Sequence, residues 1–95
     1  MHYVLVEMVK KHTYLLHDAK DVYVFGSVLN LSKKPRDIDI LIIYFNYTST
    51  IEEETRKFSE ELENDRGLSV DLTILSVEEE REVCFLDKIK ALKVK

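Results

Sequence analysis

The sequence predicts a small α/β domain in which three main β-strands are packed against helices. Apolar residues at helical spacing alternate along the chain with short runs of β-forming residues, so the predicted elements alternate between helix and strand. The length of 95 residues is that of one small domain. No linker, internal repeat or low-complexity segment divides the sequence, so we expect residues 1–95 to form a single domain.

The first half of the chain contains two of the predicted strands. Apolar residues at steps of three and four predict an amphipathic helix over Tyr3–Asp18. A run of β-forming residues then predicts a strand over Asp21–Phe25. A short helix capped by its first residue is expected over Ser27–Leu31, and a basic turn with the only proline over Ser32–Arg36. The second strand, Asp37–Tyr44, is apolar on both faces after its first three residues, as in a central strand.

The second half adds two helices and one strand. Capping boxes, in which Ser or Thr is followed three residues later by Glu, mark helix starts at Thr50 and Ser76. The first of these helices is expected to end at Gly67, a typical residue for the C-terminal end of a helix. The third strand is predicted over Leu68–Leu75. Apolar residues at helical spacing extend the last helix to Leu92.

Folding alone does not readily explain the two acids at the start of the second strand. Side chains alternate between the faces of a strand, so Asp37 and Asp39 share a face, with Cα atoms roughly 7 Å apart. Two such carboxylates repel each other, and binding a proton or a cation relieves the repulsion. Magnesium prefers oxygen ligands and commonly takes only one or two protein carboxylates. These two residues therefore indicate a magnesium site. Asp71 is the only acid of the predicted third strand.

A glycine followed by a serine stands at the end of the first strand. Gly26 allows a tight turn and a close approach to a ligand. The backbone N–H groups that follow it and the hydroxyl of Ser27 can donate to a phosphate. Nine residues separate this pair from Asp37, so a phosphate site and a metal site are expected near each other.

This pattern of residues resembles the nucleotidyltransferase domain of the DNA polymerase beta superfamily, and the small size is similar to the minimal nucleotidyltransferases (MNT) of prokaryotes. The resemblance extends from the helix before Gly26 to the segment Phe85–Ile89. It implies a small nucleotidyltransferase fold with a mixed sheet. It also implies that Asp37, Asp39 and Asp71 are catalytic and hold magnesium, as two ions. Gly26 and Ser27 would hold the triphosphate of the nucleotide.

The resemblance further implies a function. The expected reaction moves a nucleoside monophosphate, AMP from ATP, to a hydroxyl group and releases pyrophosphate. Similar minimal proteins are antitoxins of helical HEPN-type ribonuclease toxins, some of which they adenylylate, so the acceptor is expected on such a partner protein. Relatives often carry an arginine or another polar residue shortly after the Gly-Ser pair, whereas Val28 and Leu29 follow it here.

Simpler interpretations of the same residues remain open. Asp37 and Asp39 fit a solvated strand entry, Asp71 fits a charge that keeps an edge strand soluble, and Ser27 fits a helix cap. At the level of function, the alternative is a catalytically weak or inactive domain that acts by binding a protein. Self-modification and transfer to a small molecule rank lower, because so short a chain has little room for an acceptor-binding region.

Composition narrows the partners and the compartment. The net charge of −4 makes nucleic acid a poor main partner, because nucleic-acid binding draws on phosphate neutralisation. No apolar run approaches the roughly 18 residues that span a membrane, and no signal peptide is recognisable, so a cytoplasmic protein is expected. The single cysteine, Cys84, is expected to be a buried apolar residue. A domain of this size also favours a partner or self-association.

Overall fold

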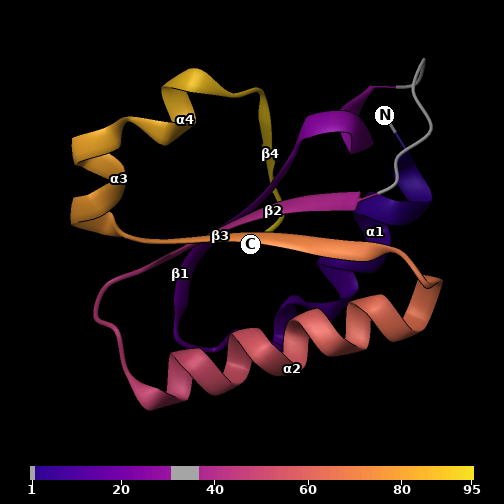
Figure 1. Ribbon diagram of the computed structural model, residues 1–95, viewed down its shortest axis with the longest axis horizontal. Helices are drawn as coiled ribbons and strands as arrows, with labels where there is room; N and C mark the ends of the chain where they lie inside the picture. Colours follow the sequence, from indigo (N-terminus) through magenta and orange to yellow (C-terminus); the bar gives the residue numbers. More distant parts are fainter. Residues whose placement is uncertain (1, 31–36) are drawn as a thin grey trace.

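The structure is a computed structural model that describes residues 2–30 and 37–95. Its described residues form a four-stranded mixed sheet with the strand order β3-β2-β1-β4 (Figure 1). The strands are β1 (Ala19–Phe25), β2 (Asp37–Tyr44), β3 (Ser69–Ser76) and β4 (Ala91–Lys93). β2 is antiparallel to β1 and parallel to β3, and β4 is antiparallel to β1. The α/β fold with a mixed sheet is confirmed, but the sheet has a fourth strand that was not predicted.

Helices lie on both sides of this sheet (Figure 1). They are α1 (Tyr3–His12), α2 (Ser49–Arg66), α3 (Val77–Val83) and α4 (Phe85–Lys88), with short 3-10 helices η1 (Thr13–Leu15) and η2 (Gly26–Leu29). α1 and α2 cover one face, and α3 and α4 lie over the other. None of the helices seen in residues 2–30 and 37–95 has the length and apolar character needed to cross a membrane.

The hydrophobic core lies between the sheet and the layer of α1 and α2. Ile38, Ile40 and Ile42 of β2 point into it, where they meet Val9 of α1 and Phe58 of α2, and all five are fully buried. Leu41 and Ile43 alternate with these residues and are buried on the opposite face of β2. The central position of β2 is therefore as the sequence predicted, and it explains why the strand lacks polar residues after Asp39.

The ends of several helices differ from the predicted ones. α1 ends at His12, not at Asp18, and one 3-10 turn follows. Ser27 lies inside η2 and does not cap it, because the N-cap is Phe25. The N-cap of α2 is Thr48 rather than Thr50, since the Thr48 hydroxyl accepts a hydrogen bond of 3.1 Å from the backbone N–H of Ile51.

Other predicted signals are confirmed. Gly67 ends α2 in the left-handed conformation. The capping box at the start of α3 has both of its hydrogen bonds, 3.0 Å from the Glu79 N–H to the Ser76 hydroxyl and 2.9 Å from the Ser76 N–H to the Glu79 carboxylate. The basic turn predicted over Ser32–Arg36 lies outside the described residues.

The largest correction concerns the last predicted helix. It breaks at Cys84, which has a φ of 52° and is exposed rather than buried. α4 follows, and the chain then extends as β4, where Leu92 pairs with Val24 of β1. The apolar residues of this region are compatible with a strand as well as with a helix, and the segment is a strand because it pairs with β1. Local spacing could not reveal that pairing.

Candidate functional site

Three carboxylates lie on one face of the sheet, at the end where β2 begins. In the parallel register of β2 and β3, Asp39 is directly opposite Asp71, so the two side chains share a face. Asp37 lies two residues before Asp39 on the same face of β2. Asp37 and Asp71 are exposed and Asp39 is half-buried. The structure thus brings together the three acids singled out in the sequence, here called the carboxylate cluster.

The electrostatics of Asp39 reflect this arrangement. Burial raises the pKa of the Asp39 carboxyl above its usual value, and the negative charges of Asp71 and Asp37 raise the same pKa further. Each of these effects disfavours the charged form of Asp39. A bound cation would favour that form, so the cluster is suited to binding one.

Gly26 lies against this cluster. The antiparallel register places Phe25 opposite Asp39, and Gly26 follows Phe25 with a φ of +76°. A Cβ atom at Gly26 would be 2.3 Å from Oδ2 of Asp39, which is closer than real Cβ contacts come. Glycine suits this position because of its positive φ, and any side chain here would have to displace the Asp39 carboxylate. Ser27 is the next residue, in η2, and is half-buried.

These residues fit magnesium better than a transition metal. Their donor atoms are oxygens, which magnesium prefers. Within residues 2–30 and 37–95, no group of three His, Cys, Asp or Glu residues is already arranged as a metal site. An open site suits magnesium, which usually keeps several water molecules and shares its coordination between one or two carboxylates and substrate phosphates.

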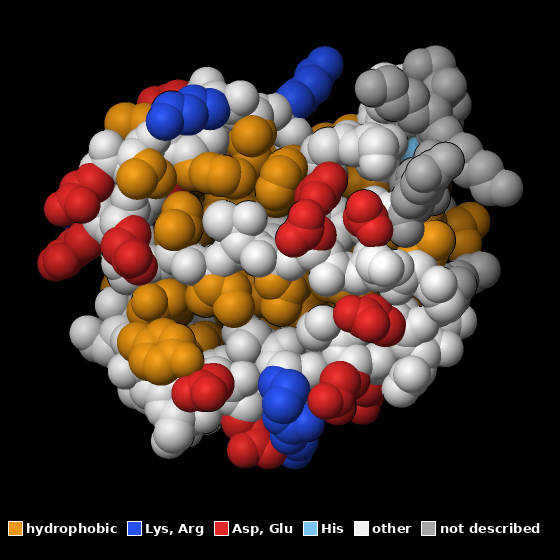
Figure 2. Space-filling view, viewed as in Figure 1, with side chains coloured by type: hydrophobic (Ala, Val, Ile, Leu, Met, Phe, Trp, Pro, Cys, Tyr) orange, Lys and Arg blue, Asp and Glu red, His pale blue; other side chains and the backbone are white. Residues whose placement is uncertain are grey.

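Next to the carboxylate cluster this face carries apolar residues, and farther along β1 it carries Tyr23 and Asp21. Leu41 and Ile43 continue β2 beyond the carboxylate cluster. Phe25 meets Phe85 of α4 edge to face, with ring centroids 5.5 Å apart. Figure 2 shows acidic side chains next to hydrophobic ones above the middle of the molecule. A ligand at the carboxylates would therefore lie beside an apolar surface.

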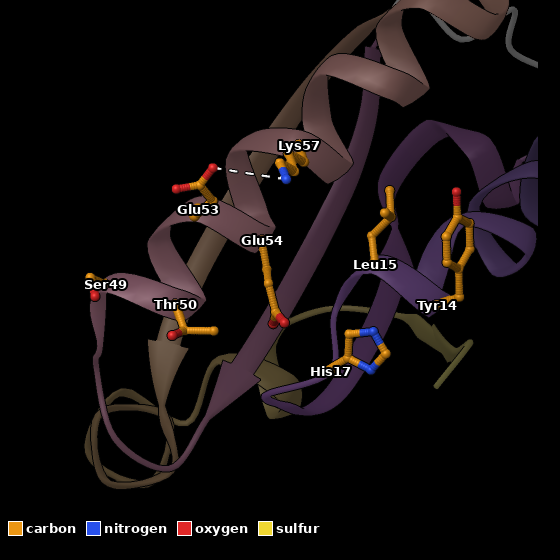
Figure 3. A pocket seen from close by; sticks show the side chains of 8 residues that line it. All are labelled: Tyr14, Leu15, His17, Ser49, Thr50, Glu53, Glu54 and Lys57. Atoms are coloured by element: carbon orange, nitrogen blue, oxygen red, sulfur yellow. Dashed lines mark ion pairs between the residues drawn. The ribbon is translucent and has the colours of Figure 1, made fainter.

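A cavity lies away from the carboxylate cluster. It has a volume of about 450 Å³, and it lies between the segment that includes η1 and the start of α2 (Figure 3). Tyr14, His17 and Glu54 are among the residues that line it, and none of the three carboxylates is. Its charged groups already interact, because Lys57 pairs with Glu53 at 3.9 Å and Glu54 accepts a hydrogen bond of 3.0 Å from the N–H of Asp18. The cavity carries no group that points to a particular ligand.

Sequence reasoning also left the position of β3 open. The simpler interpretation of Asp71 was a charge that keeps an edge strand soluble. β3 is an edge strand of the described sheet, so the location in that interpretation is correct. The register with β2 adds what that interpretation lacked, because it places Asp71 beside Asp39.

Comparison with known proteins gives one family match. The family model described as "Polymerase beta, Nucleotidyltransferase" matches residues 5–90, which is most of the chain. Among curated proteins, no sequence matches this chain significantly.

Two solved structures share the fold. A candidate nucleotidyltransferase from Sulfolobus solfataricus has a TM-score of 0.62 and 20% sequence identity, over 97% of this chain and 80% of its own. A chain from the complex of tri-AMPylated HEPN toxin with MNT antitoxin, from Shewanella oneidensis, has a TM-score of 0.64 and 15% identity, over 100% of this chain and 72% of its own. At these identities the likeness establishes the fold alone.

Proposed function

Because the chain belongs to the polymerase beta nucleotidyltransferase family, we propose that it transfers AMP from ATP to a hydroxyl group on a partner protein. One observation carries this proposal: the Asp39 carboxylate lies beside Gly26, opposite Asp71 and on the same face as Asp37. A packed domain gains nothing from such crowding of negative charge. A metal-dependent transferase needs it.

The proposed step can be written in terms of these residues. The acceptor oxygen forms a bond to the α-phosphorus of ATP, and the bond from that phosphorus to the oxygen of the leaving pyrophosphate breaks. The proton of the acceptor hydroxyl passes to Asp71, which acts as general base. The backbone N–H groups that follow Gly26 and the hydroxyl of Ser27 would donate to the triphosphate.

Asp37, Asp39 and Asp71 would hold magnesium, and we expect two ions. When bound, the metal supplies positive charge that stabilises the attacking and leaving oxygens. The chain itself contributes the placement of its carboxylates. The pairing of β2 with β3 brings Asp39 opposite Asp71, and its carboxylate lies where a side chain of residue 26 would be.

For the partner, we propose a helical HEPN-type toxin, with this chain as its antitoxin. Support comes from the Shewanella oneidensis complex, whose toxin is AMPylated and whose other component is an MNT antitoxin. Because ATP is the proposed donor, we also propose that the protein acts in the cytoplasm.

A transfer assay tests the proposed function. The chain is copurified with its partner from the native host and incubated with labelled ATP and magnesium, and label on the partner is measured. We expect Asp37→Asn and Asp39→Asn to abolish labelling. Glu61→Gln, which neutralises an exposed acid of α2, is the matched control and should label normally. Equal labelling by all variants would contradict the proposal.

A second candidate, a binding domain with a weak or absent activity, is favoured by the residues after Ser27. Val28 is fully buried and Leu29 packs against the core, so neither supplies a polar group to a triphosphate. Such a domain would bind its partner with unchanged affinity in the Asp37→Asn and Asp39→Asn variants and would transfer no label at all.

A further inference from the structure

The outer edge of β3 is open. All eight residues of β3 pair in register with β2, and no other described strand lies beyond β3. Figure 1 looks toward this edge, with β3 in front of the other strands. In the same view, Figure 2 shows a pale band across the middle of the molecule with hydrophobic side chains above and below it.

Apart from the charge of Asp71, this edge lacks the usual devices that prevent strand pairing. Ser69–Ser76 contains no proline, lysine or arginine, and Asp71 is its only charged residue. Its pairing with β2 has no register shift, unlike that of β1 with β2. An edge of this kind offers alternate backbone N–H and C=O groups to another strand over roughly 26 Å.

Both faces next to the edge suit an added strand. Val70, Leu72 and Ile74 are half-buried on the face that α1 and α2 cover. Thr73 and Leu75 are half-buried on the face of Asp71. An incoming strand has side chains on alternate faces, so it would pack against apolar groups on both.

We propose that the acceptor docks on β3 as a fifth strand and places its hydroxyl-bearing residue beside Asp71. This inference rests on the proposed function and adds the acceptor's conformation: an extended segment, outside the helices of a helical partner. Neighbouring strands are about 4.8 Å apart, so a side chain opposite Asp71 on the same face lies next to its carboxylate. The order across the sheet is then acceptor, Asp71, Asp39, which matches a reaction in which Asp71 takes the proton of the attacking hydroxyl.

Charge favours an acceptor segment over a second copy of this chain. If two copies of β3 paired about a centre near Asp71, their carboxylate clusters would lie side by side, and like charges on facing strands are destabilising. A basic side chain on an acceptor segment would instead be attracted to Asp71 and Asp37. During transfer, the docked segment keeps the hydrogen bonds between its alternate backbone groups and β3. Its hydroxyl oxygen forms a bond to the α-phosphorus, pyrophosphate leaves, and the hydroxyl proton passes to Asp71.

Backbone methylation of a peptide tests the docking. The probe is a ten-residue synthetic peptide with one central tyrosine, flanked by alternating valine and threonine, incubated with the full chain, ATP and magnesium. Two versions carry N-methyl groups on alternate amides, in opposite phases. One phase removes the hydrogen bonds to β3 and should lower AMP transfer by about tenfold or more. The other methylates amides that point away and should retain transfer. Equal rates for both phases would overturn the proposal.

Amide hydrogen exchange separates docking from chemistry. With a non-transferable ATP analogue, the peptide should protect alternate amides of β3 from exchange. The Asp71→Asn variant should show the same protection, and with ATP it should transfer no AMP. Protection without any transfer by the unmodified chain would overturn the proposed function and leave the docking surface standing. Transfer without protection would do the reverse. A dimeric chain whose β3 amides are protected without peptide would assign the edge to a second copy and overturn the docking proposal.

Discussion

Gly26 shows how the candidate site constrains a single residue. Its φ of +76° is in the region that favours glycine, and the space that a side chain would need is taken by Oδ2 of Asp39. Gly67 has a similar φ of +68°, but a Cβ atom there would meet nothing within 4 Å. The two glycines therefore separate the cost of the conformation from the cost of the contact.

We predict that Gly26→Ala and Gly67→Ala differ in stability and in ligand binding. Gly67→Ala should lower the free energy of unfolding by about 1 kcal/mol, because alanine is strained at positive φ. Gly26→Ala should lower it by about 2 kcal/mol or more, since the methyl group also displaces the Asp39 carboxylate. Urea unfolding measures both. Magnesium-dependent ATP binding, measured by calorimetry, should be lost only in Gly26→Ala, and equal binding by the two variants would count against this geometry.

We predict that Asp39→Asn stabilises the metal-free protein. Burial of Asp39 and the charges of Asp71 and Asp37 raise its pKa, so the folded state gains when this charge is removed. The expected gain in the free energy of unfolding is at most about 1 kcal/mol at neutral pH in the presence of a chelator, because solvent screens the charges around this half-buried group. Magnesium should stabilise the natural chain more than the variant. Thermal unfolding with and without magnesium checks this. A less stable Asp39→Asn protein in chelator would contradict it.

Prediction from sequence succeeded for the residues whose geometry is local. That Asp37 and Asp39 share a face follows from the alternation of side chains along one strand. That Asp71 lies opposite Asp39 depends on the register between two strands, which no local pattern encodes. The prediction of one helix through Cys84 was wrong for a related reason. The left-handed conformation of Cys84 breaks a helix that the apolar spacing alone would continue.

At the scale of elements, β4 depends on contacts from distant parts of the chain. It pairs with β1 through three residues, Ala91, Leu92 and Lys93. The ammonium group of Lys93 also lies 3.0 Å from the buried carboxylate of Asp21 on β1, which Lys20 approaches to 2.6 Å. So short a strand is poorly marked in the sequence, and these contacts explain why the segment is extended.

We predict that this ion pair gives the fold a measurable dependence on pH. Burial acts to raise the pKa of Asp21, but hydrogen bonds and charge from Lys20 and Lys93 outweigh it, so the pKa lies below the ordinary value of 3.8. The stabilisation is therefore complete above about pH 4 and is lost as the pH falls through the pKa of the folded state.

The matched variant is Asp21→Asn. At pH 7 it should unfold more easily by about 1 kcal/mol, a small value because both lysines reach solvent. It should also lose less stability than the natural chain between pH 4 and pH 2, as measured by urea unfolding across this range. Parallel pH profiles for the two proteins would show that Asp21 does not contribute.

At the scale of the whole molecule, the centre of the sheet could be predicted and its edges could not. The apolar run of β2 marks a strand that is covered on both faces, and the structure places it between β1 and β3. The mixed strand directions came from the family resemblance, because periodicity says nothing of direction. The open edge of β3 could be recognised only from the complete strand order of the sheet.

The net charge of −4 leads to a last prediction, that ATP binding requires magnesium. The triphosphate and the carboxylate cluster carry charge of the same sign, so they should repel each other unless a cation lies between them. In calorimetry, ATP should bind with magnesium and at least about 100-fold more weakly with chelator, a ratio that corresponds to about 2.7 kcal/mol.

A triple variant separates this electrostatic effect from loss of the fold. Asp37→Asn, Asp39→Asn and Asp71→Asn together remove the three charges and preserve the shapes of the side chains. We expect the variant to bind metal-free ATP more tightly than the natural chain does, to gain little from magnesium, and to transfer no AMP. If the natural chain bound ATP equally well with magnesium and with chelator, the carboxylates would not be the metal ligands. A cation held between the carboxylates and the triphosphate must relieve their repulsion and so strengthen ATP binding.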